Sequence, residues 1–143
     1  MILGPVTHFE MVQVPWSQEA EEGLRDTFYG HGDMIKSGVE SGKMILLKVF
    51  CHTPREVKTS WLVLERMPNM LFIWCYQGVG LVRLVDCLRQ YAATEGFQQL
   101  SFFTHHQAAL RGLRRFHPFA LLTPVEGEAQ YIIDTGAHSH VKQ

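Results

Sequence analysis

The chain has 143 residues, a formal net charge of −1, 46% hydrophobic residues and 19% charged residues. This length suits one domain with its own core, and the composition is that of an ordinary globular protein rather than a disordered one. The balanced charge argues against a nucleic-acid partner, which usually requires a basic excess.

Membrane, secretion and metal signals are also missing from the sequence. The longest apolar runs, Met44–Leu47 and Met70–Tyr76, are far too short to cross a bilayer, and the N-terminus lacks the pattern of a secretory signal. Cys51, Cys75 and Cys87 form no CxxC pair, and no HExxH motif occurs among the histidines. We therefore expect a cytoplasmic protein without a metal site, in which Cys75 is a small buried hydrophobe.

The first part of the chain predicts a strand followed by two short helices. Val6–Val14 alternates loosely and ends at a proline, which is typical of a strand. Ser17 can cap the helix that follows, and the acidic segment Glu19–Glu22 suits the positive end of its dipole. Asp33 can cap a second helix that continues to about Glu40.

Three segments rich in branched and aromatic residues come next, separated by turn residues. They are Lys43–Cys51, Val57–Met67 and Asn69–Tyr76. Because the links between them are short, they predict an antiparallel meander.

A helix with one apolar face follows the meander. Its stripe has helical spacing and consists of Leu81, Leu84, Val85, Leu88, Tyr91 and Ala92. Gly96 ends this helix, Gln99–Thr104 reads as a strand, and Gln107–Phe116 reads as another helix. The final strand candidates are Ala120–Thr123 and Ala129–Asp134, and residues 136–143 read as a polar, flexible tail.

The predicted order is therefore β-α-α-β-β-β-α-β-α-β, with a closing hairpin as a variant. This order indicates an α/β (α+β) fold that contains an antiparallel meander. Residues 1–143 are expected to form a single domain, because no internal repeat or linker interrupts them. Exposed strand edges would permit a homodimer without specifying its interface.

The turn Gln77-Gly78-Val79-Gly80-Leu81-Val82 lies where the last strand of the meander gives way to the apolar-faced helix. Glycine lets the backbone turn and leaves room for a ligand beside the main chain. The first N–H groups of a helix have no internal acceptor, so an anionic phosphate fits there without a lysine. The turn is not a P-loop, since no Gly-Lys-Ser/Thr follows, and it lacks the third glycine of a dinucleotide fingerprint.

This turn, in this order of elements, resembles the coenzyme A pyrophosphate loop of the GNAT superfamily, the Gcn5-related N-acetyltransferases. The family pattern is Gln/Arg-x-x-Gly-x-Gly/Ala, which Gln77 and Gly80 match at the first and fourth positions. Tyr76 resembles the aromatic residue often found before the loop. Val82 departs from the pattern at the sixth position, where a larger side chain would crowd the pyrophosphate.

The resemblance implies a divergent GNAT-like fold, in which helices flank a mixed, mostly antiparallel sheet. It also implies a site for acetyl-CoA or another acyl-CoA as co-substrate. Strand residues Phe72, Ile73 and Trp74 would offer backbone groups to the pantetheine arm. The main chain of the turn, reaching Arg83, would hold the pyrophosphate. The cofactor-binding set is Phe72, Ile73, Trp74, Gln77, Gly78, Val79, Gly80, Leu81, Val82 and Arg83. A cleft would open where the strand ending near Tyr76 parts from the strand ending near Thr104.

The family often uses a tyrosine in the helix after the fifth strand to protonate the departing thiolate, but Gln107–Phe116 contains none. His105 and His106 are the candidate substitutes, because imidazole exchanges protons near neutral pH, although the favoured interpretation of each is that it caps or begins a surface helix. Thr104 can supply a hydroxyl to the same cleft or bond its own backbone. Glu65 is a weaker candidate for the base, and a solvated strand-end charge is the favoured interpretation.

The resemblance thus predicts a single-domain acyltransferase that moves an acetyl group from coenzyme A to an amine of a small molecule or a protein. The alternative is a structural or interaction protein that keeps the GNAT fold without catalysis, of a kind that also occurs among bacteriophage products. Val82 and the missing tyrosine favour this alternative. A cleft plugged by Trp74, Tyr76 or Val82 would indicate it.

Overall fold

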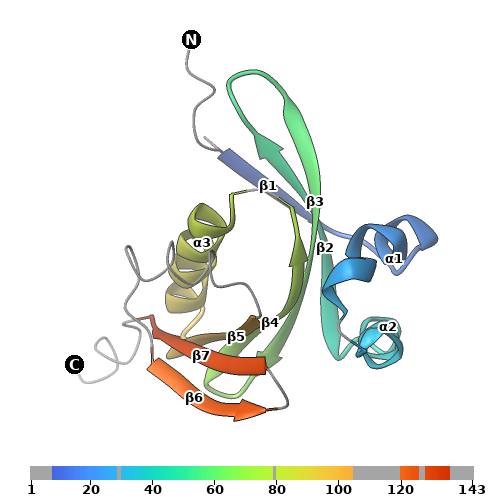
Figure 1. The fold of residues 1–143 in the computed structure, drawn as a ribbon. Helices are drawn as coiled ribbons and strands as arrows, with labels where there is room; N and C mark the ends of the chain where they lie inside the picture. Colours follow the sequence, from blue (N-terminus) through green and yellow to red (C-terminus); the bar gives the residue numbers. More distant parts are fainter. Residues whose placement is uncertain (1–7, 29, 79, 105–119, 126–127, 136–143) are drawn as a thin grey trace. The chain divides into compact units, whose positions relative to one another are not determined.

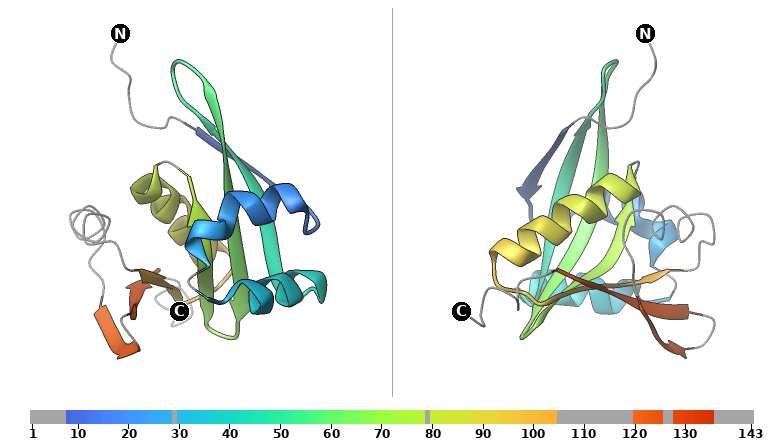
Figure 2. Two further views of the ribbon diagram at one scale, coloured as in Figure 1. Left: turned by 45° about the vertical axis from the view of Figure 1, so that its right-hand side comes forward. Right: turned by 90° about the vertical axis from the view of Figure 1, so that its left-hand side faces the viewer.

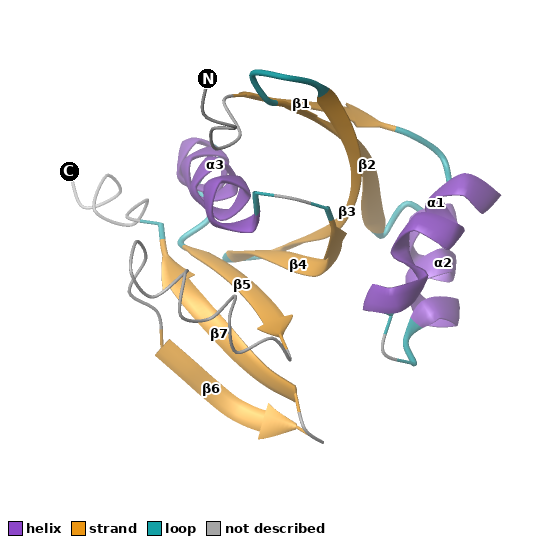
Figure 3. Ribbon diagram, turned by 45° about the horizontal axis from the view of Figure 1, so that its top comes forward, coloured by secondary structure: helices purple, strands orange, loops and turns teal. Residues whose placement is uncertain are grey.

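The computed structural model describes residues 8–28, 30–78, 80–104, 120–125 and 128–135 (Figure 1). The elements, in chain order, are β1 (His8–Gln13), α1 (Gln18–Leu24), the 3-10 turn η1 (Arg25–Thr27), α2 (Gly32–Glu40), β2 (Met44–His52), β3 (Val57–Met67), β4 (Met70–Gln77), α3 (Leu81–Thr94), β5 (Gln99–Thr104), β6 (Ala120–Val125) and β7 (Glu128–Asp134) (Figure 3). The predicted order is found over these residues, and the expected helix Gln107–Phe116 lies outside them.

The strands are hydrogen-bonded in the order β1-β2-β3-β4-β5-β7-β6. β4 and β5 pair in parallel, whereas the β1–β2, β2–β3, β5–β7 and β6–β7 pairs are antiparallel. The predicted mixed, mostly antiparallel sheet is therefore confirmed. The chain divides into two compact units, residues 1–65 with 74–80 and residues 66–73 with 81–143, so that β4 contributes one half to each.

The first two helices begin with different local chemistry. Ser17 caps α1 as predicted, because its Oγ accepts the backbone N–H of Ala20 at 3.1 Å. The predicted cap of α2 is wrong by position. That helix starts at Gly32 after His31, and Asp33 lies within its first turn. There its carboxylate still faces the positive end of the helix dipole.

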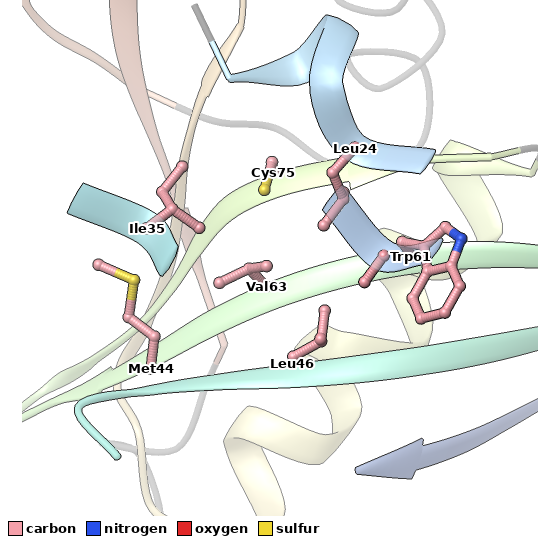
Figure 4. Packing of buried hydrophobic residues seen from close by; sticks show 8 residues of the cluster. Leu24, Ile35, Met44, Leu46, Trp61, Val63 and Cys75 are labelled. Atoms are coloured by element: carbon pink, nitrogen blue, oxygen red, sulfur yellow. The ribbon is translucent and has the colours of Figure 1, made fainter. Parts of the chain in front are cut away.

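In the first unit, α1 and α2 pack on one face of β2 and β3 (Figure 2). The core between them is apolar and is made of Ala20, Leu24, Ile35, Met44, Leu46, Trp61, Val63 and Cys75 (Figure 4). Cys75 is buried as predicted, and desolvation raises the pKa of its thiol to about 12 against the weaker opposite effect of a hydrogen bond with Thr27.

Packing against the Trp61 indole is tight enough to require a glycine in α1. A Cβ at Gly23 would lie 2.5 Å from both Cδ1 and Nε1 of Trp61. The Nζ of Lys48 lies 5.4 Å from the centroid of the Trp61 ring and 3.7 Å from a carboxylate oxygen of Glu19. The predicted acidic start of α1 thus lies beside a cation of the same unit.

In the second unit, α3 packs against β5. Four residues of the predicted stripe are buried, namely Leu84, Val85, Leu88 and Ala92. Tyr91 was expected in the same stripe, but 38% of it is exposed. Gly96 adopts a φ of 87° just after the helix and ends it as predicted.

Arg66 accounts for the outward position of Tyr91. Its guanidinium donates to the Tyr91 hydroxyl, lies 3.6 Å from a carboxylate oxygen of Glu95, and stands 6.0 Å from the centroid of the Phe97 ring. These contacts join the end of β3 to the last turn of α3 and the residues after it. The aromatic ring is therefore held by a cation outside the core.

None of the helices in the described ranges combines the length and the apolar character needed to span a bilayer. Over the same ranges, no three His, Cys, Asp or Glu side chains gather in a way that could hold a metal ion.

Candidate functional site

The turn between β4 and α3 has the backbone geometry of a sharp change of direction. β4 ends at Gln77, α3 begins at Leu81, and Gly80 between them adopts a φ of 72°. This left-handed conformation is open to glycine and costly for residues with a Cβ. Because α3 starts on the next residue, its first N–H groups have no acceptor within the helix and form a region of positive potential. An anion can bind such a region.

The predicted cofactor residues of the turn differ in exposure. Gln77, Gly78 and Arg83 are exposed, whereas Gly80, Leu81 and Val82 are half-buried. Val79 lies outside the described residues. The turn therefore offers polar and backbone groups on both sides of Gly80, and the predicted role of these residues in binding a cofactor stays a prediction.

Gly78 is required for a different reason from the one the sequence indicated. The described glycines with positive φ are Gly30, Gly42, Gly80 and Gly96, so the conformation of Gly78 does not itself demand glycine. A Cβ at Gly78 would instead overlap the Cβ and Oγ of Ser60 and would lie 2.9 Å from the hydroxyl of Tyr76. The space that we expected to remain free for a ligand is, on this side, occupied by β3 and β4.

Ser60 belongs to a cluster of hydroxyl and thiol groups on three neighbouring strands. Ser60 and Cys51 are buried, with 3.4 Å between the Ser60 Oγ and the Cys51 Sγ. The Cys51 Sγ lies 3.8 Å from the hydroxyl of half-buried Tyr76. Burial raises the pKa of Tyr76, and a hydrogen bond with Ser60 opposes this effect. The phenol therefore stays protonated at neutral pH.

Glu65 corrects the sequence interpretation most clearly. Its carboxylate was expected to be a solvated strand-end charge, but only 8% of the residue is exposed. Its Oε1 accepts the indole N–H of Trp74 at 2.9 Å. Glu65 pairs with Met44 of β2 in the sheet register. Burial of a carboxylate is costly unless it is compensated, and the indole is a neutral donor. A buried carboxylate therefore stands directly beside Trp74, one of the predicted pantetheine-contacting residues.

The remaining predicted site residues are described only in part. Phe72 and Ile73 are buried and pair with Ser101 and Phe102 of β5. Thr104 is the last residue of β5 and pairs with Ala129 of β7.

His105 and His106 lie outside the described residues, so the structure does not place the candidate proton carriers. The predicted cleft between Tyr76 and Thr104 stays a prediction.

Two residues that the sequence did not indicate contribute to this region. Serine in a strand gives no signal of its own, and the importance of Ser60 depends on the position of Gly78, one residue beyond the end of the next strand. Cys51 was noted only for lacking a CxxC partner. Neither contact can be found without the register of β2, β3 and β4.

Comparison with known proteins identifies the architecture. No family model and no curated protein matches the sequence. Among solved structures, the apo form of FdhC, a nucleotide-linked sugar GNAT, matches at 14% identity with a TM-score of 0.58, over 96% of this chain and 93% of that chain. The ribosomal-protein-S18-alanine N-acetyltransferase from Escherichia coli matches at 11% identity with a TM-score of 0.58, over 88% and 92%.

An N-acetyltransferase from Staphylococcus aureus Mu50 matches at 10% identity with a TM-score of 0.54, over 90% of this chain and 99% of that chain. Likeness at such low identity speaks to the fold and leaves the activity open. The matches cover nearly the whole of this chain and of each matched structure, and they agree with the predicted resemblance. The chain therefore has the fold of the GNAT N-acetyltransferases.

Proposed function

We propose that the protein is an acyltransferase that moves an acetyl group, or another acyl group, from coenzyme A to an amine, and that it acts in the cytoplasm. The observation that carries the proposal is the left-handed Gly80, directly before the first turn of α3, in a chain with the GNAT fold. The backbone N–H groups of this turn would bind the pyrophosphate. Exposed Arg83, in the first turn of the helix, would add positive charge.

The chain's contribution to the reaction would be mainly positioning. The thioester of acetyl-CoA supplies an activated acyl group when it is bound. Holding that group and an amine in reacting geometry replaces an encounter in solution with a step inside one complex. Trp74 is expected to contact the pantetheine arm, because it follows directly after the β4 residues that pair with β5. Its indole is already oriented by the hydrogen bond to Glu65.

Glu65 is our proposed proton acceptor for the amine. An amine must be uncharged to attack a thioester, and a carboxylate can take up its proton. Among the side chains that the structure describes, Glu65 unites a buried carboxylate with a hydrogen bond to a predicted cofactor residue. His105 or His106 would then return a proton to the departing thiolate.

Binding is the first test of the proposal. Isothermal titration of the wild-type protein with acetyl-CoA is expected to show saturable binding, and no measurable binding at millimolar ligand would contradict it. Arg83→Ala is expected to raise the Kd about threefold, the size of a solvent-exposed charge contact. Arg55→Ala is the matched control, because Arg55 is also exposed but lies in the turn between β2 and β3. It should leave the Kd unchanged.

Turnover is the second test and separates the enzyme from the alternative. Release of free coenzyme A from acetyl-CoA is measured over a panel of amines that includes amino acids, polyamines, aminoglycosides and peptides. Glu65→Gln keeps an oxygen acceptor for Trp74 but removes the carboxylate, so we expect kcat/KM to fall by at least about a hundredfold with an unchanged Kd for acetyl-CoA. An active Glu65→Gln variant would exclude Glu65 as the base. Binding without turnover on any amine would favour the non-catalytic interaction protein.

A further inference from the structure

The contact between Gly78 and Ser60 has a consequence for the turn itself. Gly78 is one residue beyond the end of β4 and two residues before Gly80, whose left-handed φ directs the chain into α3. On the side facing β3, the space that a Gly78 side chain would need is filled by the Cβ and Oγ of Ser60. The main chain of the turn can therefore approach β3 this closely only while residue 78 has no side chain and residue 60 stays small.

Ser60 is itself fixed by its surroundings. It is 1% exposed, and its Oγ lies 3.4 Å from the Sγ of buried Cys51 on β2. Tyr76 on β4 approaches both groups, through its contact with Cys51 and its hydrogen bond with Ser60. Three strands thus hold the Ser60 side chain where it meets Gly78, so the position of the turn depends on a closely packed part of the sheet.

We propose that Ser60 is a positioning residue for coenzyme A binding, which acts by setting the distance of the Gly78 backbone from β3. The inference rests on the proposed function, because it assigns to Ser60 an effect on the binding of the pyrophosphate. Ser60 would not touch the ligand. It would determine where the backbone N–H groups of the turn lie, and a displaced donor makes a poorer hydrogen bond.

The experiment is a set of single and double variants, each measured for coenzyme A affinity by titration calorimetry and for thermal stability. Gly78→Ala is expected to raise the Kd about tenfold, since overpacking that shifts a backbone costs enough for a factor of this size. Ser60→Gly removes the two atoms closest to the new methyl group, the Cβ and Oγ of Ser60, and leaves only the Tyr76 hydroxyl at 2.9 Å, on a side chain that can shift. The Kd of the Ser60→Gly/Gly78→Ala double variant for coenzyme A is therefore expected to lie within about threefold of the Kd of the Ser60→Gly single variant.

Two further double variants make the rescue specific. Ser60→Ala/Gly78→Ala keeps the Cβ of residue 60 and with it the overlap, so its Kd should stay as weak as that of Gly78→Ala. Thr59→Gly/Gly78→Ala introduces the same flexible residue one position away in β3, where the exposed Thr59 side chain points to the other side of the strand. It should not restore binding either.

Each outcome decides a different point. The positioning role is supported if, among the three double variants, only Ser60→Gly/Gly78→Ala recovers the Kd for coenzyme A. Equal rescue by Thr59→Gly, no rescue by Ser60→Gly, or wild-type affinity in Gly78→Ala would overturn it. Rescue seen in thermal stability but not in the Kd would also overturn it, because the contact would then be purely structural. If the wild-type protein does not bind coenzyme A, the proposed function is refuted, and this inference with it. If the wild-type protein binds normally but the effects of Ser60→Gly and Gly78→Ala on the Kd simply add in the double variant, only the inference is refuted.

Discussion

Replacing Gly80 by alanine tests whether the turn before α3 matters for the ligand or only for the fold. Gly80 has a φ of 72°, and an L-residue in this region is less stable by about 1–2 kcal/mol. Alanine also reduces the freedom of the unfolded chain, which offsets about 0.4–1 kcal/mol of that cost. We therefore expect Gly80→Ala to lower the free energy of unfolding by about 1 kcal/mol, or a few degrees in Tm for a chain of this size.

The matched control is Gly42→Ala in the turn between α2 and β2. Gly42 has a φ of 86°, and a Cβ there would meet no atom within 4 Å, so its substitution carries the conformational cost alone. Both variants should lose similar stability in urea titrations. Only Gly80→Ala should bind coenzyme A more weakly, by about tenfold if one backbone donor is lost. Equal affinity in the two variants would refute the assignment of the turn as the pyrophosphate site.

Three further predictions concern stability. Gly23→Ala should lower the free energy of unfolding by about 1–3 kcal/mol in urea titrations, because the new methyl group would lie 2.5 Å from the Trp61 indole; wild-type stability would contradict the packing. Arg66→Ala should lower the free energy of unfolding by about 1 kcal/mol, because the contacts to α3 are lost. Arg66→Lys should restore little of this stability, because an ammonium lacks the planar fork of a guanidinium. Full recovery with lysine would exclude guanidinium geometry as the source of the stabilisation. The pKa of Cys75 is raised from 9.0 to about 12, so the unfolded chain loses this proton first as pH rises. Its contribution to stability is complete below pH 9 and is lost towards pH 12, by about 1.4 kcal/mol per pH unit. Cys75→Ala should therefore show a shallower alkaline decline in unfolding free energy, and an identical slope would contradict this origin.

Local signals were sufficient for most of the secondary structure. Val57–Met67 was predicted with the bounds that the structure shows, because its residues are branched and aromatic and turn residues flank it. Gly96 was correctly placed at the end of α3, since a left-handed residue after a helix favours glycine. The cap of α2 was predicted at Asp33, two residues after the observed cap His31, because the helix already begins at Gly32.

Tertiary contacts explain what the sequence could not show. Tyr91 follows the apolar spacing of α3, but its orientation depends on Arg66, 25 residues earlier in the chain. The sequence suggests that Glu65 is a solvated charge near the end of its strand. In the structure it is buried and accepts the indole N–H of Trp74 on the next strand. The reason for Gly78 is likewise on another strand, in Ser60. The contacts of Glu65 and Gly78 depend on how neighbouring strands are aligned, which hydrophobic pattern and turn residues specify only incompletely. The contact of Tyr91 depends on where α3 lies against the end of β3.

The central claim is that the turn from Gln77 to Arg83 binds the pyrophosphate of coenzyme A through its backbone. The most direct measurement is a titration of the isotope-labelled wild-type protein with coenzyme A, followed through its backbone amide resonances, with pantetheine as the ligand that lacks the pyrophosphate. We predict that the amides of Gly78, Gly80 and Leu81 shift most with coenzyme A and much less with pantetheine. Equal shifts with both ligands, or shifts confined to other parts of the chain, would contradict the claim.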